Sequence, residues 1–247
     1  MKPKIFYTVH AKGGSGASLF ATNFAYALSK KHPRKRILFL DANQFSDIAN
    51  LFGIKAKKNI LNLNMFFKEK HFNAQNRKNL RDIFAKNAYQ INNLDVLLSP
   101  EEFNPQVQLN SIYKEIISAG LNIYDYIIID SERDNNKLFQ FSLPNTERIF
   151  IVTTADKPAI TKTTNFLKTF SDEATILQKI NLIYNQAGKF SEKELQNIFE
   201  FPMAAILPTE NNGAWDNVLL GVPIIENKKL AYSKKINRLI DNLFNPV

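Results

Sequence analysis

A short segment near the start of the chain has the composition of a phosphate-binding loop. Residues 11 to 18 read Ala-Lys-Gly-Gly-Ser-Gly-Ala-Ser. In the common loop G-x-x-x-x-G-K-[ST], backbone N–H groups surround the phosphates, a lysine reaches the β- and γ-phosphate oxygens, and the hydroxyl binds Mg²⁺. Gly16 and Ser18 stand at the expected places, but Ala17 replaces that lysine, and another lysine, Lys12, precedes the glycines. We therefore expect a loop that binds a nucleotide better than it cleaves one.

The residues around this loop favour phosphate binding over a merely structural turn. Small side chains let backbone N–H groups approach an anion, and the helix predicted to follow adds the positive end of its dipole. The order is a strand, then the loop, then a helix, as in known phosphate sites. The candidate nucleotide-binding residues in the loop are Lys12, Gly13, Gly14, Ser15, Gly16, Ala17 and Ser18.

Two acidic residues end strands that are predicted to lie in the same sheet as this loop. Asp130 follows the apolar run Tyr-Asp-Tyr-Ile-Ile-Ile, and Asp41 follows Ile-Leu-Phe-Leu. An aspartate in the first setting holds Mg²⁺ directly or through water in many phosphate-transferring proteins. We predict that Asp130 and Ser18 support the metal and that Asp41 is the next candidate, with a catalytic role.

The elements that must position these residues are predicted from the alternation of apolar runs with helical patterns. This alternation is typical of an α/β fold with a single doubly wound, mostly parallel sheet flanked by helices. Residues 45 to 92 are predicted to be mostly helical, and nothing in the composition marks a linker, so residues 1–247 are expected to form one domain. We expect strands at 5–10, 36–41, 94–99, 124–130, 148–153, 180–185 and 203–207, and helices at 18–31, 105–119 and 230–244.

Composition limits the function classes. The chain has 247 residues, a formal net charge of +9 and no cysteine. Without cysteine it has no disulfide framework, no thiolate metal site and no iron–sulfur cluster. The first residues lack the apolar core of a signal peptide, and no window has the roughly 20 apolar residues of a spanning helix, so we expect a soluble, cytoplasmic protein.

The loop and several later segments resemble a known family. Lys12-Gly-Gly-Ser-Gly-Ala-Ser18 resembles the deviant Walker A motif, K-G-G-x-G-K-[ST], of the ParA/MinD family. Residues 38–49 are most similar to its CpaE/TadZ branch, where the stretch runs approximately L-x-D-x-D-x-Q-F-G-D-x-A. Further similar landmarks are residues 94–100, 124–130, 184–186, 208–210 and 220–223.

The resemblance implies a P-loop NTPase fold that binds ATP and Mg²⁺ in a sandwich homodimer. In that arrangement Lys12 reaches across the interface to the partner's phosphates, and Asn185 lies near the adenine. The CpaE/TadZ branch acts at cell poles, where it helps to localise a Tad or type IV-like pilus secretion machine. The resemblance therefore implies pilus or secretion assembly proteins at the membrane as partners, and recruitment to the cell pole or inner membrane face.

Two departures from the family pattern concern hydrolysis. Ala17 removes the charge that would neutralise the β- and γ-phosphates within the same chain, and Asn43 replaces the second acid of the D-x-D pair. Loss of one preorganised group in such a site costs roughly 10²–10³-fold in rate. Two losses together predict weak or absent ATP hydrolysis, while the loop amides, Mg²⁺ and Lys12 still favour binding.

Three readings of the function stay open at this point. The first is a dimeric ATP-binding switch or scaffold with little turnover. The second is an active ATPase for polar localisation or cargo and DNA partitioning, in which Lys12 acts in trans. The third is a homologue that binds no nucleotide. Contact with DNA through the positive charge stays an option that is not favoured, because the basic residues are scattered apart from residues 30–36. Contact with a membrane through the apolar positions of the helix at 230–244 is not favoured either, because that helix continues the globular pattern.

Overall fold

The computed structural model describes residues 3–44, 46–68, 77–101, 109–132, 136–186, 192–199, 201, 203–210 and 213–244. Within them the strands form one eight-stranded sheet in the order β3-β4-β2-β5-β1-β6-β7-β8. Every neighbouring pair is parallel except β3 and β4, so the predicted doubly wound, mostly parallel sheet is confirmed. The strands are β1 (Lys4–His10), β2 (Ile37–Ala42), β3 (Tyr89–Ile91), β4 (Leu94–Leu97), β5 (Tyr126–Ser131), β6 (Thr146–Thr153), β7 (Ile180–Tyr184) and β8 (Met203–Ile206).

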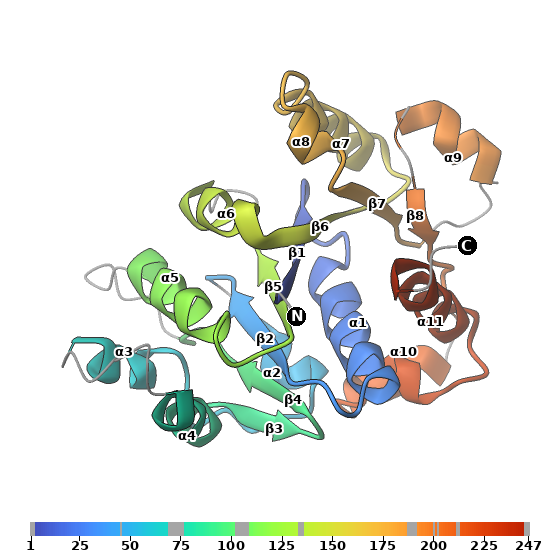
Figure 1. Ribbon diagram of the computed structural model, residues 1–247. Coiled ribbons are helices and arrows are strands. Elements are labelled where there is room, and N and C mark those ends of the chain that lie inside the picture. Colours follow the sequence, from blue (N-terminus) through green and yellow to red (C-terminus); the bar gives the residue numbers. More distant parts are fainter. Residues whose placement is uncertain are drawn as a thin grey trace.

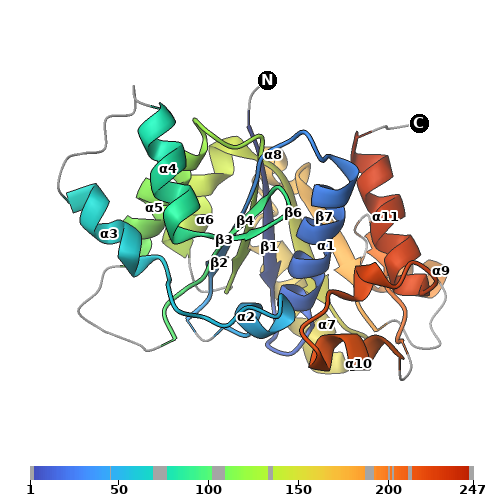
Figure 2. The same ribbon diagram turned by 90° about the horizontal axis from the view of Figure 1, so that it is seen from below.

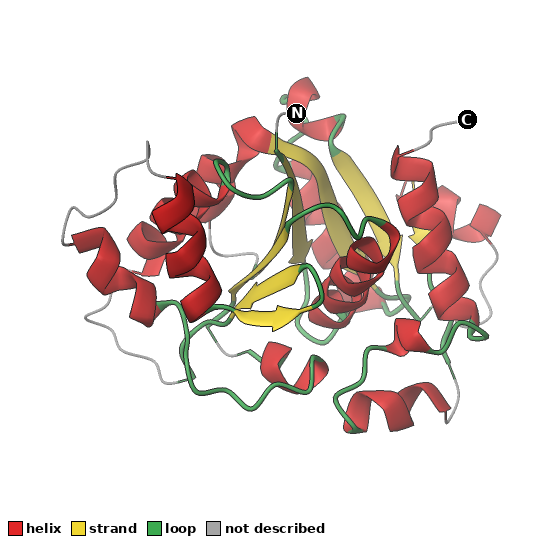
Figure 3. Cartoon of the chain, turned by 60° about the horizontal axis from the view of Figure 1, so that its bottom comes forward, coloured by secondary structure: helices red, strands yellow, loops and turns green. Residues whose placement is uncertain are grey.

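Helices cover both faces of the sheet (Figures 1 and 3). One face is packed by α3 (Leu61–Lys68), α4 (Arg77–Asn87), α5 (Leu109–Gly120), α6 (Asn136–Ser142), α7 (Lys157–Lys168), α8 (Ala174–Leu177) and α9 (Glu192–Phe199). The other is packed by α1 (Ala17–Lys31), α2 (Ile48–Leu51), α10 (Gly213–Leu219) and α11 (Ala231–Phe244). Short 3₁₀ turns occur at Leu143–Asn145 and Ile224–Glu226.

The central strands form because their residues are apolar on both faces. All six residues of β2 and of β5 are buried. A strand buried on both sides reads as a continuous hydrophobic run, as expected when helices cover both faces of a parallel sheet. α1 packs on this sheet through Phe20, Phe24 and Leu28, which are fully buried at helical spacing. The central strands and α1 therefore hold the β1–α1 loop between two rigid elements.

One predicted region needs correction. The segment predicted to be mostly helical at 45–92 contains a non-helical connection between α2 and α3 and ends in the short edge strand β3, which pairs antiparallel with β4. The sequence does not predict β3, because Tyr89 and Ile91 are only partly buried, Gln90 is exposed, and the three residues form no apolar run. The helix predicted at 105–119 is observed as α5 from Leu109, and residues 105–108 lie outside the described part of the chain.

The apolar face of α11 packs inside the protein, as favoured from the sequence. Ile236, Leu239 and Ile240 are buried in the same core as α1 and the sheet. Lys31 of α1 donates to the Asn237 carbonyl oxygen at 3.0 Å. Among the described residues, no helix has the length and apolar character needed to cross a bilayer.

Candidate functional site

The pairing of the strands brings the predicted acids together beside the loop. Asp41 of β2 and Asp130 of β5 are partners in the parallel register, and Thr8 of β1 is the partner of Asp130 on the other side. The carboxyl ends of parallel strands share one edge of a sheet, where ligands of open α/β folds bind. Figure 2 shows that α2, α7 and α10 lie on the side of the molecule where these strands end. The β1–α1 loop and the two acids therefore form one candidate site.

The loop has the backbone of an anion-binding turn. Gly14 and Gly16 adopt positive φ angles of 79° and 83°, and Gly16 is the N-cap of α1. Positive φ favours glycine because other residues meet a steric penalty there. A Cβ atom built on Gly13 or Gly14 would meet no heavy atom within 4 Å, so open space adjoins the backbone at both residues. The N–H groups at the start of α1 are thus placed where a phosphate can be held.

Asn185, which the resemblance places near a base, contacts the loop itself. Its Nδ2 donates to the Ser15 carbonyl oxygen at 2.9 Å in a buried hydrogen bond. A Cβ atom on Gly16 would lie 2.2 Å from the same Nδ2, so Gly16 must be glycine for this contact to exist. Asn185 therefore ties the end of β7 to the loop of β1.

The cavity beside Asn185 is small in the described residues. It has a volume of about 20 Å³ and is lined also by Pro208, Glu210 and Tyr232. A volume of this size holds about one water molecule. A purine placed against Asn185, as the resemblance implies, requires the walls of this cavity to move outward.

Lys12 is paired within its own chain. Its Nζ lies 2.9 Å from Asp156 Oδ1, and both side chains are about one-third exposed. Asp156 is the N-cap of α7 and accepts from the Ala159 N–H at 3.1 Å and from the Thr154 hydroxyl at 2.6 Å. The Thr154 hydroxyl first, and then Lys12, lower the pKa of Asp156 to about 2. To reach a partner's phosphates, Lys12 must leave this carboxylate.

Asn43 bridges the two buried acids. Its Nδ2 donates to Asp130 Oδ2 at 2.7 Å and to Asp41 Oδ1 at 3.2 Å. The other carboxylate oxygen of Asp41 accepts from the backbone N–H and the hydroxyl of Ser99, both at 3.1 Å. All of these side chains are buried. Asn43, which stands in place of the second acid of the D-x-D pair, thus donates hydrogen bonds to both carboxylates.

Burial raises the pKa of both acids. For Asp41 the dominant cause is desolvation, which hydrogen bonds from Ser46, Ser99 and Asn43 partly offset. For Asp130 desolvation and the nearby charge of Asp41 raise the pKa to about 7, against the lowering effect of Ser18 and Asn43. A buried carboxylate with a raised pKa binds either a proton or a cation near neutral pH.

Asp130 and Ser18 fit a divalent cation on geometric grounds. Asp130 Oδ1 is buried and has no hydrogen bond of normal geometry among the described residues, although the Ser18 hydroxyl lies close enough to lower its pKa. In the described part of the chain, no group of three or more His, Cys, Asp or Glu side chains forms a metal cluster. Mg²⁺ commonly takes one or two protein oxygens, with phosphate and water completing its shell. The residues present thus suit a cation that arrives with a phosphate.

Three contacts of this site escaped the sequence interpretation. The sequence pattern indicates only the loss of an acid at Asn43 and predicts no role for Asp156 or Glu132. Glu132 Oε1 accepts from the Gln44 N–H at 2.9 Å and so joins the segments after β5 and β2. Asp156 could have been found, because an aspartate directly before Lys-Pro is a typical helix start. No local signal marks the Glu132 contact.

Comparisons with known proteins agree with this architecture. A family model described as "AAA domain" matches residues 3–183. An uncharacterized ATP-binding protein of Methanocaldococcus jannaschii is 25% identical over 191 residues, which are 73% of each chain. The septum site-determining protein MinD of Thermotoga maritima is 23% identical over 255 residues, covering 95% of this chain and 86% of MinD. The crystal structure of a ParA family ATPase from Chlorobium tepidum superposes with a TM-score of 0.79 at 22% identity, covering 98% of this chain and 99% of that one.

Proposed function

The chain belongs to the AAA domain family and has the fold of a ParA family ATPase, and from this premise we propose that it is a nucleotide-holding switch. In this proposal it binds ATP with Mg²⁺ at the β1–α1 loop, forms a homodimer and hydrolyses ATP weakly or not at all. The dimer serves as a scaffold that localises a Tad or type IV-like pilus or secretion assembly.

The arrangement of Asn43 between Asp41 and Asp130 supports the weak hydrolysis. An amide in this position donates a hydrogen bond and cannot accept the proton of an attacking water. Asp41, the remaining acid candidate, is 1% exposed and accepts hydrogen bonds from Asn43 and Ser99. The carboxylate that would activate water is therefore buried and already hydrogen-bonded. This network is the observation that carries the proposal.

The binding side of the site retains its groups. The site still offers the loop amides, Ser18 and the unsatisfied Oδ1 of Asp130, which suit a phosphate that carries Mg²⁺. The bound Mg²⁺ would neutralise phosphate charge in the absence of a lysine at position 17. Lys12 is the remaining cation at the loop and supports the dimer, because it can exchange Asp156 for the partner's nucleotide. Asn185 holds the loop in shape through Ser15.

Calorimetric titration with ATP and Mg²⁺, together with steady-state phosphate release, tests the nucleotide part. We expect micromolar binding and turnover far below the roughly 1 s⁻¹ at the low end of typical enzymes. Turnover at about a few per minute or faster, abolished by Lys12→Ala, contradicts weak hydrolysis and establishes the alternative, an active ATPase with Lys12 acting in trans. Absence of any ATP binding contradicts both.

The localisation part rests on the resemblance of residues 38–49 to the CpaE/TadZ branch. A fluorescent fusion in native cells should form foci at the pole. A Gly16→Val variant should lose those foci, because its side chain would clash with Asn185 and the loop could not keep this shape. A diffuse or nucleoid-bound wild-type signal would contradict the pilus role and favour cargo or DNA partitioning.

A further inference from the structure

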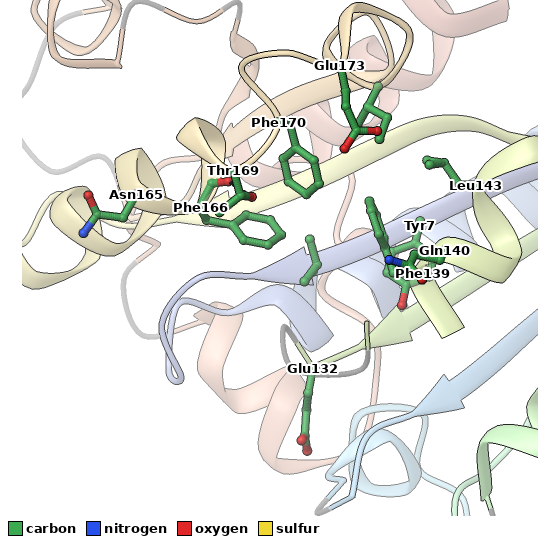
Figure 4. A pocket seen from close by; sticks show the side chains of 12 residues that line it. Tyr7, Glu132, Phe139, Gln140, Leu143, Asn165, Phe166, Thr169, Phe170 and Glu173 are labelled. Carbon is green, nitrogen blue, oxygen red and sulfur yellow. Dashed lines mark hydrogen bonds between the residues drawn. The ribbon is translucent and has the colours of Figure 1, made fainter. Parts of the chain in front are cut away.

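A second cavity lies away from the phosphate loop, on the sheet face opposite α1. It has a volume of about 550 Å³ and opens between α6, α7 and α8 (Figure 4). Its floor is formed by Tyr7 and Val9 of β1, which belong to the core on that face. Small-molecule sites have volumes of about 300–1,000 Å³ and apolar walls with a few polar groups. The size of the cavity is thus in the range of a ligand site.

The walls present a connected row of aromatic rings. The Phe139 ring contacts Tyr7 at 5.2 Å between centroids and Phe170 at 5.7 Å, and Phe170 contacts Phe166 at 5.2 Å. Phe139, Phe166 and Phe170 are all partly exposed, so ring faces and edges remain accessible from the cavity. Ring faces attract apolar groups and also cations, through the negative face of the π-system.

The charged side chains described in the lining of the cavity are carboxylates, beside neutral polar groups such as Gln140 and Asn165. Among the residues that the structure describes, its lining includes Glu132 and Glu173 and contains no lysine or arginine. Glu132 is turned away from the rings in Figure 4, and its carboxylate accepts from the Gln44 N–H. Glu173 lies beside Phe170, and its exposed carboxylate has no hydrogen bond or ion pair within the described residues. Lys179 does not line the cavity, and its Nζ donates to the carbonyl oxygen of the lining residue Leu143 at 2.9 Å.

We propose that this cavity binds a small organic ammonium ion that carries a flat apolar group, with the apolar group against Phe139, Phe166 and Phe170 and the ammonium near Glu173. An anion is disfavoured, since Glu173 repels it, and a neutral molecule lacks both the charge pairing and the cation–π attraction. None of its three ring residues belongs to the phosphate loop or the acid network, although Glu132 lines this cavity and also joins the candidate site by accepting from the Gln44 N–H.

Three probes of similar size test the charge preference: phenethylamine, phenethyl alcohol and hydrocinnamate. Each is titrated into the full chain without nucleotide and followed by amide NMR spectra. We expect phenethylamine to bind about 5-fold more tightly than the alcohol, with hydrocinnamate weakest, and the shifted amides to lie in α6, α7 and α8. Equal affinities, or shifts that map to another surface, would overturn the proposal.

Two variants with a matched control locate the interaction. Glu173→Gln should weaken phenethylamine about 3-fold and leave the alcohol unchanged, whereas Asp172→Asn removes the same charge one residue outside the lining and should change neither. Phe170→Leu keeps an apolar side chain but removes the π-face, so it should reduce the preference for the amine over the alcohol. If Asp172→Asn and Glu173→Gln act alike, or if Phe170→Leu leaves the preference intact, the proposed site is wrong.

Discussion

The loop after β1 and the acid pair at the ends of β2 and β5 face the same edge of the sheet, but their polar groups are arranged differently. Around Gly13 and Gly14 the loop is open, and the side chain of Lys12 is about one-third exposed and bound to an exchangeable partner, Asp156. The acid pair is buried, and Asn43 occupies the space between its carboxylates. The difference teaches that, in the proposed switch, the groups expected to bind the anion are accessible, whereas the groups expected to support hydrolysis are held in an internal hydrogen-bond network.

The largest expected effect comes from removing the buried charge of Asp130. Its pKa of about 7 in the folded protein lies above the ordinary value of 3.8. The stability contributed by the protonated carboxyl is therefore fully present below about pH 4 and is lost as the pH rises through 7. At pH 8 without metal, Asp130→Asn should therefore stabilise the protein by up to about 4 kcal/mol. Urea unfolding in EDTA at pH 5 and pH 8 measures this.

The same variant separates stability from ligand binding. Asp130→Asn should lose the extra stability that Mg²⁺ and ATP give to the wild-type protein, because it removes a metal ligand. If Asp130→Asn keeps the wild-type pH dependence of stability, or is less stable than wild type at pH 8, then the charge of Asp130 does not destabilise the folded protein.

The loop should be nearly as sensitive at Gly16. Gly16→Ala places a Cβ 2.2 Å from Asn185 Nδ2 at a positive φ angle, so it breaks the buried bond to Ser15. We expect a loss of about 2–4 kcal/mol in the free energy of unfolding and loss of ATP binding. Gly13→Ala is the matched control, since its Cβ meets open space, and its stability should stay within about 0.5 kcal/mol of wild type. Equal destabilisation by both variants would refute the role of the Asn185 contact.

Restoring the acid at position 43 should have an intermediate effect. Asn43→Asp removes the donor to Asp41 and Asp130 and places a third carboxylate between them. Without metal we expect a destabilisation of about 1–3 kcal/mol, which Mg²⁺ should offset more strongly than in the wild type. Thermal unfolding with and without Mg²⁺ measures the difference, and a variant as stable as wild type in EDTA would argue against the bridging amide.

The smallest change concerns the partner of Lys12. Asp156→Asn keeps an N-capping side chain on α7 but removes the charge that holds Lys12, so the apo stability should change by less than about 1 kcal/mol. The ATP-dependent dimer should become several-fold tighter by analytical ultracentrifugation. Glu147→Gln is the control, because it breaks a similarly exposed ion pair with Lys4 at 3.0 Å away from the site. Unchanged dimerisation in Asp156→Asn would mean that this pair does not restrain Lys12.

The sequence predicted the elements better than the contacts between them. The strands were predictable because β2 and β5 are continuous apolar runs, and the loop and both acids were predictable because they directly follow such runs. The bonds of Asn185 to Ser15, Lys12 to Asp156 and Asn43 to Asp130 join residues 170, 144 and 87 positions apart. No periodicity encodes such pairs, since they depend on strand order and on side-chain direction in three dimensions. The cavity between α6 and α7 was missed for the same reason.

In the proposed switch, hydrolysis is limited on the acid side of the site and not by the missing lysine. Ala17→Lys tests this most directly, with ATP affinity and single-turnover hydrolysis measured on the same preparation. We predict that the added charge tightens ATP binding about 10-fold and leaves the rate of hydrolysis close to that of the wild type while Asn43 remains. Hydrolysis restored by Ala17→Lys alone, at about a few turnovers per minute or faster, would contradict the account.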